Sequence, residues 1–283
     1  MTVQTDVERY YDRNTPAFAR FGQGGRAIHR AVWAPGVQSR ADAFRYVDGV
    51  VLKEIERLSL GSSEPLHVLD LGCGVGASLS FLASRAPIRG SGVTLSGVQA
   101  QAARASCEAA NLAHRLSFVQ ADFLNLPKTI PPAQLAFAIE AFVHSADAAA
   151  FFAAAARQIV PGGLLIVCDD FLSARGDSPS QTQRQRRHLE EVRTCWLAAS
   201  LLSVAQAEAL AAHSGFERLS TQDLTPFLEL RRVRDRAITL LVTLGRPFRP
   251  QGYRFRSLVG GNALQMALVQ GLLEYRLMIW QKR

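Results

Sequence analysis

The feature that most constrains the fold of this chain is the segment Val68-Leu-Asp-Leu-Gly-Cys-Gly-Val-Gly76. An apolar run ends in a turn that holds three glycines, and the residues after Gly76 resume a helical pattern. Glycines let the backbone turn tightly and let a ligand approach it closely, at the point where a helix begins. A strand, a glycine turn and a helix in this order predict a nucleotide-binding βαβ unit.

Strands and helices alternate along the rest of the chain. Apolar runs typical of strands cover 92–95, 116–120, 135–139 and 164–168, and helical patterns such as the Ala-rich stretch 148–160 separate them. The segment Leu273–Trp280 alternates well enough to be a final strand. This order predicts an α/β fold with a Rossmann-like, mostly parallel seven-stranded sheet and helices on both of its faces.

Helical segments are expected before the sheet and inserted into it. Asp6 is a candidate cap for a first helix that Asn14-Thr15-Pro16 would end, and 40–58 carries apolar residues on one face. We expect residues 1–60 to form an N-terminal helical lid on a core of residues 61–283. Polar, arginine-rich residues after Leu172, followed by an apolar helix around Trp196–Leu202, predict a helical cap inserted around 172–262.

Two classes of ligand compete for the glycine turn. Gly72, Gly74 and Ala77 also fit the dinucleotide fingerprint, so NAD is the alternative. That fingerprint expects an acid about 20 residues further on, at the end of the second strand. The second strand ends Val93-Thr-Leu-Ser96 without an acid, and an acid stands before the glycines instead, at Asp70. Both observations disfavour an NAD-linked oxidoreductase.

The order of these motifs resembles the class I S-adenosylmethionine (SAM)-dependent methyltransferases, whose first motif is an apolar strand, an acid and G-x-G-x-G. It is most similar to the subgroup of sterol, tocopherol, cyclopropane-fatty-acid and ubiquinone-pathway enzymes, in which the second strand ends in a form like Gly92-Val-Thr-Leu-Ser-Gly-Val-Gln99. The match continues through Ala121-Asp-Phe123, Glu140-Ala-Phe-Val-His144 and Ile159-Val-Pro-Gly-Gly163, and it covers residues 65–170 well.

The resemblance implies SAM as the cofactor and assigns a role to each matching position. Each position also has a structural alternative: the glycines could only make a turn, Asp122 could cap a helix, and Phe123 could belong to the core. The implied roles are the methionine end of the cofactor for Asp70, Gly72 and Gly74, the ribose for Thr94, Ser96 and Gln99, the adenine for Asp122 and Phe123, and closure of the pocket for Tyr11.

Glu140 and His144 are the candidate catalytic residues. They follow the fourth strand, at the rim where open α/β sheets place their active sites. Glu140 is the first candidate base and His144 the second. Glu140 could instead contact the amino group of the cofactor, and His144 could cap or pack a helix start. The four cysteines lack metal-ligand spacing, so we expect no metal, and their scatter suggests a reducing, cytoplasmic setting.

Composition bears mainly on the methyl acceptor. The net charge of +8 rests on arginine, but no nucleic-acid motif accompanies it, and no apolar run reaches the roughly 20 residues of a membrane span. The apolar cap favours a small hydrophobic acceptor, and its arginines would suit an anionic head such as an isoprenyl diphosphate. Carbon methylation is placed ahead of O- or N-methylation. A non-catalytic SAM-binding protein is a further alternative, and a homo-oligomer stays open.

Overall fold

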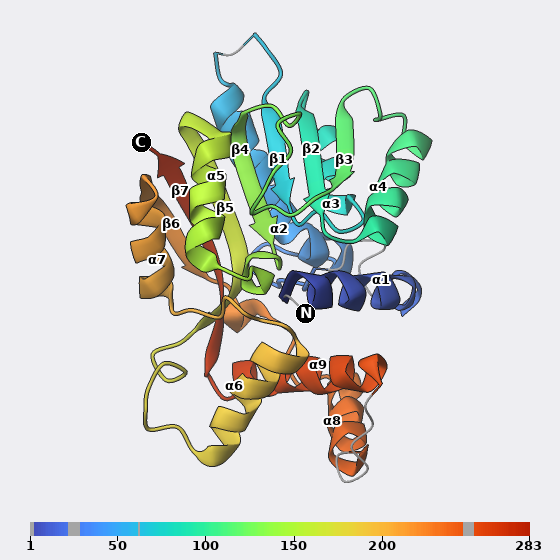
Figure 1. Ribbon diagram of the computed structural model, residues 1–283, viewed down its shortest axis with the longest axis vertical. Coiled ribbons are helices and arrows are strands. Elements are labelled where there is room, and N and C mark those ends of the chain that lie inside the picture. Colours follow the sequence, from blue (N-terminus) through green and yellow to red (C-terminus); the bar gives the residue numbers. More distant parts are fainter. Residues whose placement is uncertain (1–2, 22–28, 62, 246–251) are drawn as a thin grey trace.

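A computed structural model describes residues 3–21, 29–61, 63–245 and 252–283 (Figure 1). Its seven strands form one sheet in the order β3-β2-β1-β4-β5-β7-β6. The first five strands pair in parallel, and β7 pairs antiparallel with both β5 and β6. The fold class expected from the sequence is confirmed. The strands are β1 (His67–Leu71), β2 (Arg89–Thr94), β3 (Leu116–Gln120), β4 (Ala133–Ile139), β5 (Ile159–Leu172), β6 (Phe216–Asp223) and β7 (Leu273–Lys282).

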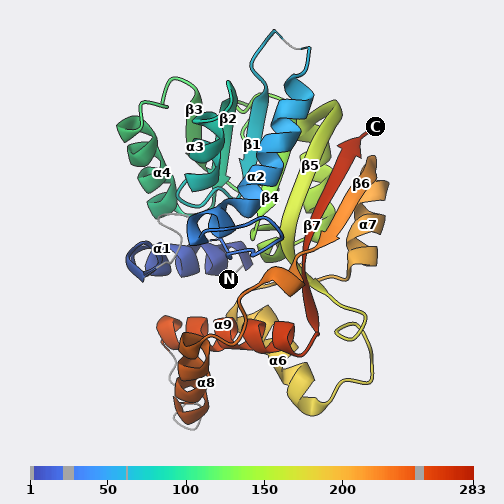
Figure 2. The same ribbon diagram turned by 180° about the vertical axis from the view of Figure 1, so that it is seen from behind.

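Helices cover both faces of the sheet (Figures 1 and 2). One face carries α5 (Ala148–Gln158) and α7 (Val204–His213), and the other carries α2 (Arg40–Ser59), α3 (Ala77–Ala83) and α4 (Gly97–Ala109). Side chains alternate between the two faces along β4, as the pleat of a strand requires. Leu135 and Phe137 pack in the cluster that includes α2, whereas Ala136 packs in the cluster that includes α5.

The remaining helices lie at the end of the sheet where the parallel strands finish. Helix α1 (Val3–Phe21) passes between this end and a cap made of α6 (Gln183–Cys195), α8 (Val233–Gly245) and α9 (Tyr253–Val269) (Figure 1). The cap has its own apolar cluster, to which α6 contributes Leu189 and Val192 and α9 contributes Leu264. Short 3-10 turns, η1 (Phe142–His144) and η2 (Thr225–Phe227), follow β4 and β6.

The structure divides the N-terminal and cap segments differently from the expectation. Only α1 of the N-terminal helices crosses the end of the sheet, because the apolar face of α2, with Val47, Val51 and Ile55, packs into the core. The stretch 172–262 is not one continuous cap either. After α6 the chain returns to the sheet as α7 and β6, where β6 pairs with β7, before α8 and α9 complete the cap.

Three local predictions differ from the structure. Helix α1 does not end before Pro16 but continues to Phe21. Tertiary hydrogen bonds, such as the one that the Ser96 hydroxyl donates to Asp12, hold it in place. The segment Trp196–Leu202 is not helical, because α6 ends at Cys195 and Leu197 takes a left-handed φ of 62° that reverses the chain. The turn expected at 161–163 lies inside the longer strand β5, where pairing with β4 shifts register.

Candidate active site

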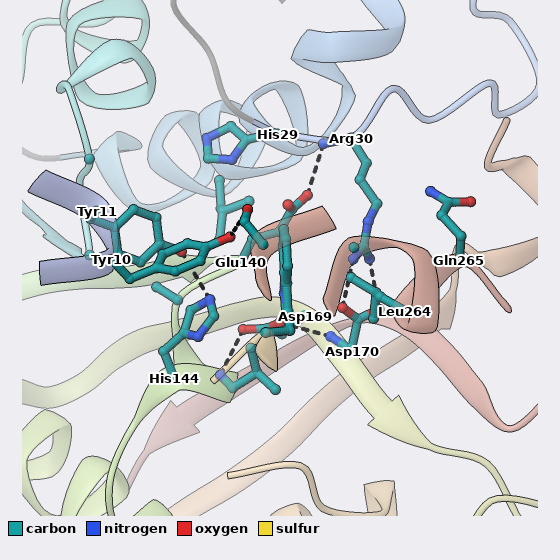
Figure 3. Close-up of a pocket in the computed structure, with 18 of the residues that line it drawn as sticks. Tyr10, Tyr11, His29, Arg30, Glu140, His144, Asp169, Asp170, Leu264 and Gln265 are labelled. Atoms are coloured by element: carbon teal, nitrogen blue, oxygen red, sulfur yellow. Dashed lines mark hydrogen bonds and ion pairs between the residues drawn. The ribbon is translucent and has the colours of Figure 1, made fainter. Parts of the chain in front are cut away.

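A cavity of about 430 Å³ lies between the end of the sheet, α1 and the cap (Figure 3). Its volume is in the range of small-molecule sites. Residues of the glycine turn and of the end of β2 line one part of it, and residues of α8 and α9 line another. The cavity therefore joins the predicted cofactor region to the cap. Among the site residues expected from the sequence, those that line it are Tyr11, Gly72, Gly74, Thr94, Ser96, Gln99, Phe123, Glu140 and His144.

The glycine turn has the backbone conformation that its sequence predicts. Gly72 and Gly74 adopt positive φ angles of 102° and 51°. The amides of Gly72 and Cys73 both donate to the carbonyl of Val93, at 3.0 and 2.8 Å, which fixes the turn against the end of β2. A Cβ on Gly74 would meet nothing nearer than Nε2 of Gln99 at 4.0 Å. The backbone at Gly74 is thus open to a ligand in the cavity.

The end of β2 is a connected polar cluster. The Thr94 hydroxyl donates to Oε1 of Gln99 at 2.8 Å, and Oγ of Ser96 accepts the Gln99 amide as the N-cap of α4. Ser96 also donates to Oδ1 of Asp12 on α1 at 2.5 Å. This bond holds α1 across the predicted ribose region. Asp12 was not foreseen from the sequence, because nothing local marks it as the partner of a residue 84 positions away.

Three of the predicted residues lie at the margin of the site or outside it. Asp70 is buried in β1 and is not among the lining residues; burial, with the charge of Asp48 adding to it, raises the pKa of its carboxyl well above the ordinary value. Asp122 is also outside the lining, and its Oδ1 accepts the amide of Leu124 at 2.9 Å. Phe123 lines the cavity and packs edge-on against Phe151, so it serves the core as well.

Glu140 is the centre of a hydrogen-bond network rather than a free carboxylate. Its Oε1 accepts from the backbone amide of Arg30 at 2.8 Å and from the hydroxyl of Tyr275 at 2.9 Å (Figure 3 shows the first). The Arg30 guanidinium makes two bonds of 2.7 Å to Asp170 and lies 4.8 Å from the centroid of the Tyr275 ring. The backbone of Glu140 is left-handed, with φ 52°, directly after the last residue of β4.

His144 forms a hydrogen-bonded pair with Tyr11 inside the cavity (Figure 3). Its Nδ1 lies 3.1 Å from the carbonyl oxygen of Leu197, so Nδ1 must carry a proton. Burial lowers the pKa of His144 below 6.5, which leaves the ring neutral near pH 7. The other nitrogen, Nε2, is then an acceptor, and it accepts from the Tyr11 hydroxyl at 3.0 Å. The arrangement is a neutral base with a fixed tautomer.

The end of β5 adds a buried carboxyl. Asp169 is fully buried, lines the cavity and accepts the backbone amides of Val143 and Asp170. Burial, together with the charge of Asp170, raises the pKa of Asp169 to about 8. This carboxyl is therefore mostly protonated near pH 7. The lining of the cavity near Asp169 therefore carries less negative charge at pH 7 than the number of its acidic residues would indicate.

Comparison with known proteins identifies the family. Residues 68–163 match the model described as a methyltransferase domain. An O-methyltransferase of Pyrenophora dematioidea is 26% identical over 78% of each chain. The O-methyltransferase rstn1 of Aspergillus nomiae is 30% identical over 64% of this chain and 78% of its own length. This chain is a class I SAM-dependent methyltransferase. The family suspected from the glycine turn is confirmed, and its cofactor is SAM.

The structural similarity to one solved protein covers almost the whole of this chain. The mycolic acid cyclopropane synthase CmaA1, solved with SAH and CTAB, superposes with a TM-score of 0.77 over 99% of this chain and 98% of that one. Identity is 17%, so the match speaks for the fold alone. The geometry of the cavity also suits the cofactor, because the backbone at Gly74 is open beside the polar cluster at the end of β2.

Several lining residues of the methyltransferase were not foreseen. Asp169 and Asp170 directly follow the expected fifth strand, so the rule that selected Glu140 would also have selected them. Arg30 carries no local signal, because its partner Asp170 is 140 positions away. Within the described residues, no group of three or more His, Cys, Asp or Glu is arranged to hold a metal ion, and no helix is long and apolar enough to cross a membrane.

Proposed function

We propose that this methyltransferase transfers the methyl group of SAM to a hydroxyl of a small, hydrophobic, uncharged acceptor, with His144 as the general base. The observation that carries the proposal is the neutral imidazole of His144, whose Nε2 already accepts a hydroxyl inside the cavity. SAM supplies an activated methyl group on a sulfonium. A hydroxyl of the acceptor replaces Tyr11 at Nε2, and His144 takes up its proton as the oxygen becomes methylated.

The hydrophobic character of the acceptor follows from the cap side of the cavity. Apolar side chains from several elements line this side, and Trp196 and Tyr10 add aromatic faces. Burial of apolar surface is the main driving force for binding such an acceptor. The apolar side chains of this region are Val143, Leu228, Leu230, Ile238, Leu258 and Leu264.

The charges of the lining argue for an uncharged acceptor rather than the anionic one considered from the sequence. Arg30 is engaged by Asp170. The Nε of Arg232 lies 3.1 Å from a carboxylate oxygen of Asp235, and another nitrogen of its guanidinium lies 3.9 Å from a carboxylate oxygen of Glu229. The positive charge of Arg232 is therefore already balanced. A diphosphate needs several cations that are free to neutralise it. Of the three arginines that the described part of the chain contributes to the lining, Arg30 and Arg232 are paired with acids, which leaves Arg234 at the exposed rim as the one cation for an anionic group.

Glu140 is better suited to a supporting role than to the role of first candidate base. Its Oε1 already accepts two hydrogen bonds from the protein, so that oxygen is occupied by donors other than an acceptor molecule. It fixes the segment that begins at Arg30 against the ends of β4 and β7. The geometry therefore favours His144 over Glu140, reversing the order suggested by the sequence.

Carbon methylation, which the sequence analysis placed first, is the second candidate here. The observation that favours it is the set of carboxyl and aromatic groups that surround the reaction region, with Glu140, Tyr11 and Trp196 in the lining. A carbocation formed on an alkene would be stabilised by such a carboxylate and by aromatic faces. In this case Glu140, not His144, would carry most of the effect on turnover.

The test is a substrate panel with wild type and the His144→Gln and Glu140→Gln variants. The acceptors are apolar phenols and alcohols, matched amines, and isoprenoid alkenes with and without a diphosphate, and methylated products are detected by mass. The proposal expects methyl ethers and a loss of turnover in His144→Gln at unchanged affinity for S-adenosylhomocysteine. Products methylated only on carbon, with His144→Gln as active as wild type, would overturn it.

A further inference from the structure

Helix α8 has an apolar face on each side. Its inner side packs on α9, where Val242 is buried and the Thr239 hydroxyl donates to Oδ1 of Asn262 at 2.7 Å. Its outer side is a stripe of apolar side chains at helical spacing, i, i+4, i+7, i+8 and i+11, which we call the α8 stripe. The stripe consists of Val233, Ala237, Leu240, Leu241 and Leu244, and its large side chains are 59% to 84% exposed.

Arginines flank the α8 stripe on both edges. At about 100° per residue, Arg234 lies beside one edge and Arg236 beside the other, and both are exposed. The helix contains one acidic residue, Asp235, which faces away from the stripe and is held by Arg232. An apolar stripe between cations is the pattern of a helix that lies in the plane of an anionic membrane surface, with arginine side chains reaching the headgroups.

The position of α8 connects this surface with the cavity. α8 lies at the end of the molecule farthest from the helices over the sheet, with α9 between it and the strands (Figures 1 and 2). Ile238 and Arg234, on the same helix as the stripe, line the cavity. A hydrophobic molecule dissolved in a bilayer under α8 would therefore be close to the cap side of the proposed acceptor site.

We infer that the α8 stripe docks this methyltransferase on the surface of an anionic lipid bilayer, from which it takes its acceptor. The delivery of the acceptor rests on the proposed function, whereas the docking rests on the stripe and its charges. A second copy of the chain fits the stripe less well. A stable protein interface takes about 20–30 residues on each side, and the stripe offers five from one helix.

Vesicle flotation of the full chain tests the inference. Wild type is mixed with phosphatidylcholine vesicles, with or without phosphatidylglycerol. The variant Leu240→Ser/Leu241→Ser removes the centre of the stripe without touching the cavity lining. The matched control is Leu60→Ser/Leu219→Ser, which changes two exposed leucines outside the cap, 81% and 48% exposed. We expect wild type and control to float with anionic vesicles, at a level that falls with salt, and the stripe variant to bind about tenfold or more weakly.

Two readouts separate this inference from the proposed function. Affinity for S-adenosylhomocysteine and turnover of a water-soluble acceptor should be equal in wild type, stripe variant and control, which also shows that each is folded. The inference is overturned if wild type does not float with anionic vesicles, or if the stripe variant floats as well as wild type. It is also overturned if light scattering shows a dimer that only the stripe variant loses, because the stripe would then be an interface between copies.

Discussion

Replacing Arg30 by methionine tests how far the cavity depends on one buried ion pair. The guanidinium of Arg30 makes two bonds of 2.7 Å to Asp170, whose side chain is only 2% exposed, and it lies over the ring of Tyr275. Methionine keeps the aliphatic stem and the backbone amide that donates to Glu140, so the change removes the charge and little else. Asp170 is left buried without its cation.

The expected cost follows from what the orphaned carboxyl can do. Breaking a buried pair by removing one partner costs about 3–5 kcal/mol of unfolding free energy. The carboxyl can limit this loss by taking up a proton, which for an ordinary aspartic acid costs about 4 kcal/mol at pH 7 but about 1.5 kcal/mol at pH 5. The loss relative to wild type should therefore be about 3–4 kcal/mol at pH 7 and clearly smaller at pH 5. The penalty grows as pH rises because the unfolded chain releases that proton more readily.

Urea denaturation followed by circular dichroism at pH 5 and pH 7 measures both values. The second variant, Arg30→Met/Asp170→Asn, removes the carboxyl as well and should recover a large part of the loss at pH 7. The control is Arg57→Met, which breaks the exposed pair with Glu54 and should cost under about 1 kcal/mol. A loss below about 1 kcal/mol for Arg30→Met, or an equal loss at both pH values, would refute the reasoning.

Three further predictions concern the site itself. His144→Gln should lower kcat about 100- to 1,000-fold; because burial lowers the pKa of His144, wild-type activity should fall only as pH drops below 6.5, and pH–rate profiles of the variant should lack that limb. Gly72→Ala puts a side chain at φ 102° against Ala141, so calorimetry should show weaker binding of S-adenosylhomocysteine than in the control Gly36→Ala, at φ 89° in open space. Asp169→Asn should flatten the dependence of stability on pH. The raised pKa of Asp169, about 8, favours the folded state below pH 4, and this contribution is lost as pH rises towards 8; urea midpoints across that range measure the difference in slope.

The part of the site that could be predicted from the sequence is the part whose geometry is local. The turn after β1 needs only a strand, three glycines at positive φ and the start of a helix, all within residues 68–77. Ser96 caps α4 three residues before the amide it accepts. In such segments the residue types largely determine the backbone, so their order along the chain was sufficient to predict the glycine turn and the fold class.

The cap could not be predicted to the same extent, because α8 and α9 have apolar residues on more than one side. A sequence pattern marks an apolar face but does not say what covers it. In α8, the inner Val242 is buried by α9, whereas the outer Leu240 and Leu241 are exposed. The return of the chain to the sheet as β6 also depends on pairing with β7, more than fifty residues later in the chain. These choices are made by tertiary contacts.

The same distinction explains why the sequence could predict two candidate bases after β4 but could not predict their different roles. Glu140 and His144 both follow β4, yet their chemistry differs because of partners that come from elsewhere in the fold. Tyr275 and Arg30 occupy one oxygen of Glu140.

Leu197 fixes the tautomer of His144 through its carbonyl oxygen, and the backbone of Leu197 is left-handed, with φ 62°. Such a conformation costs about 1–2 kcal/mol in a residue other than glycine. The amides of Ala198 and Ser200, bonded to the carbonyls of Val192 and Val143, hold the segment in place. Strain maintained beside a buried, neutral imidazole is the arrangement expected where the protein fixes a base for catalysis.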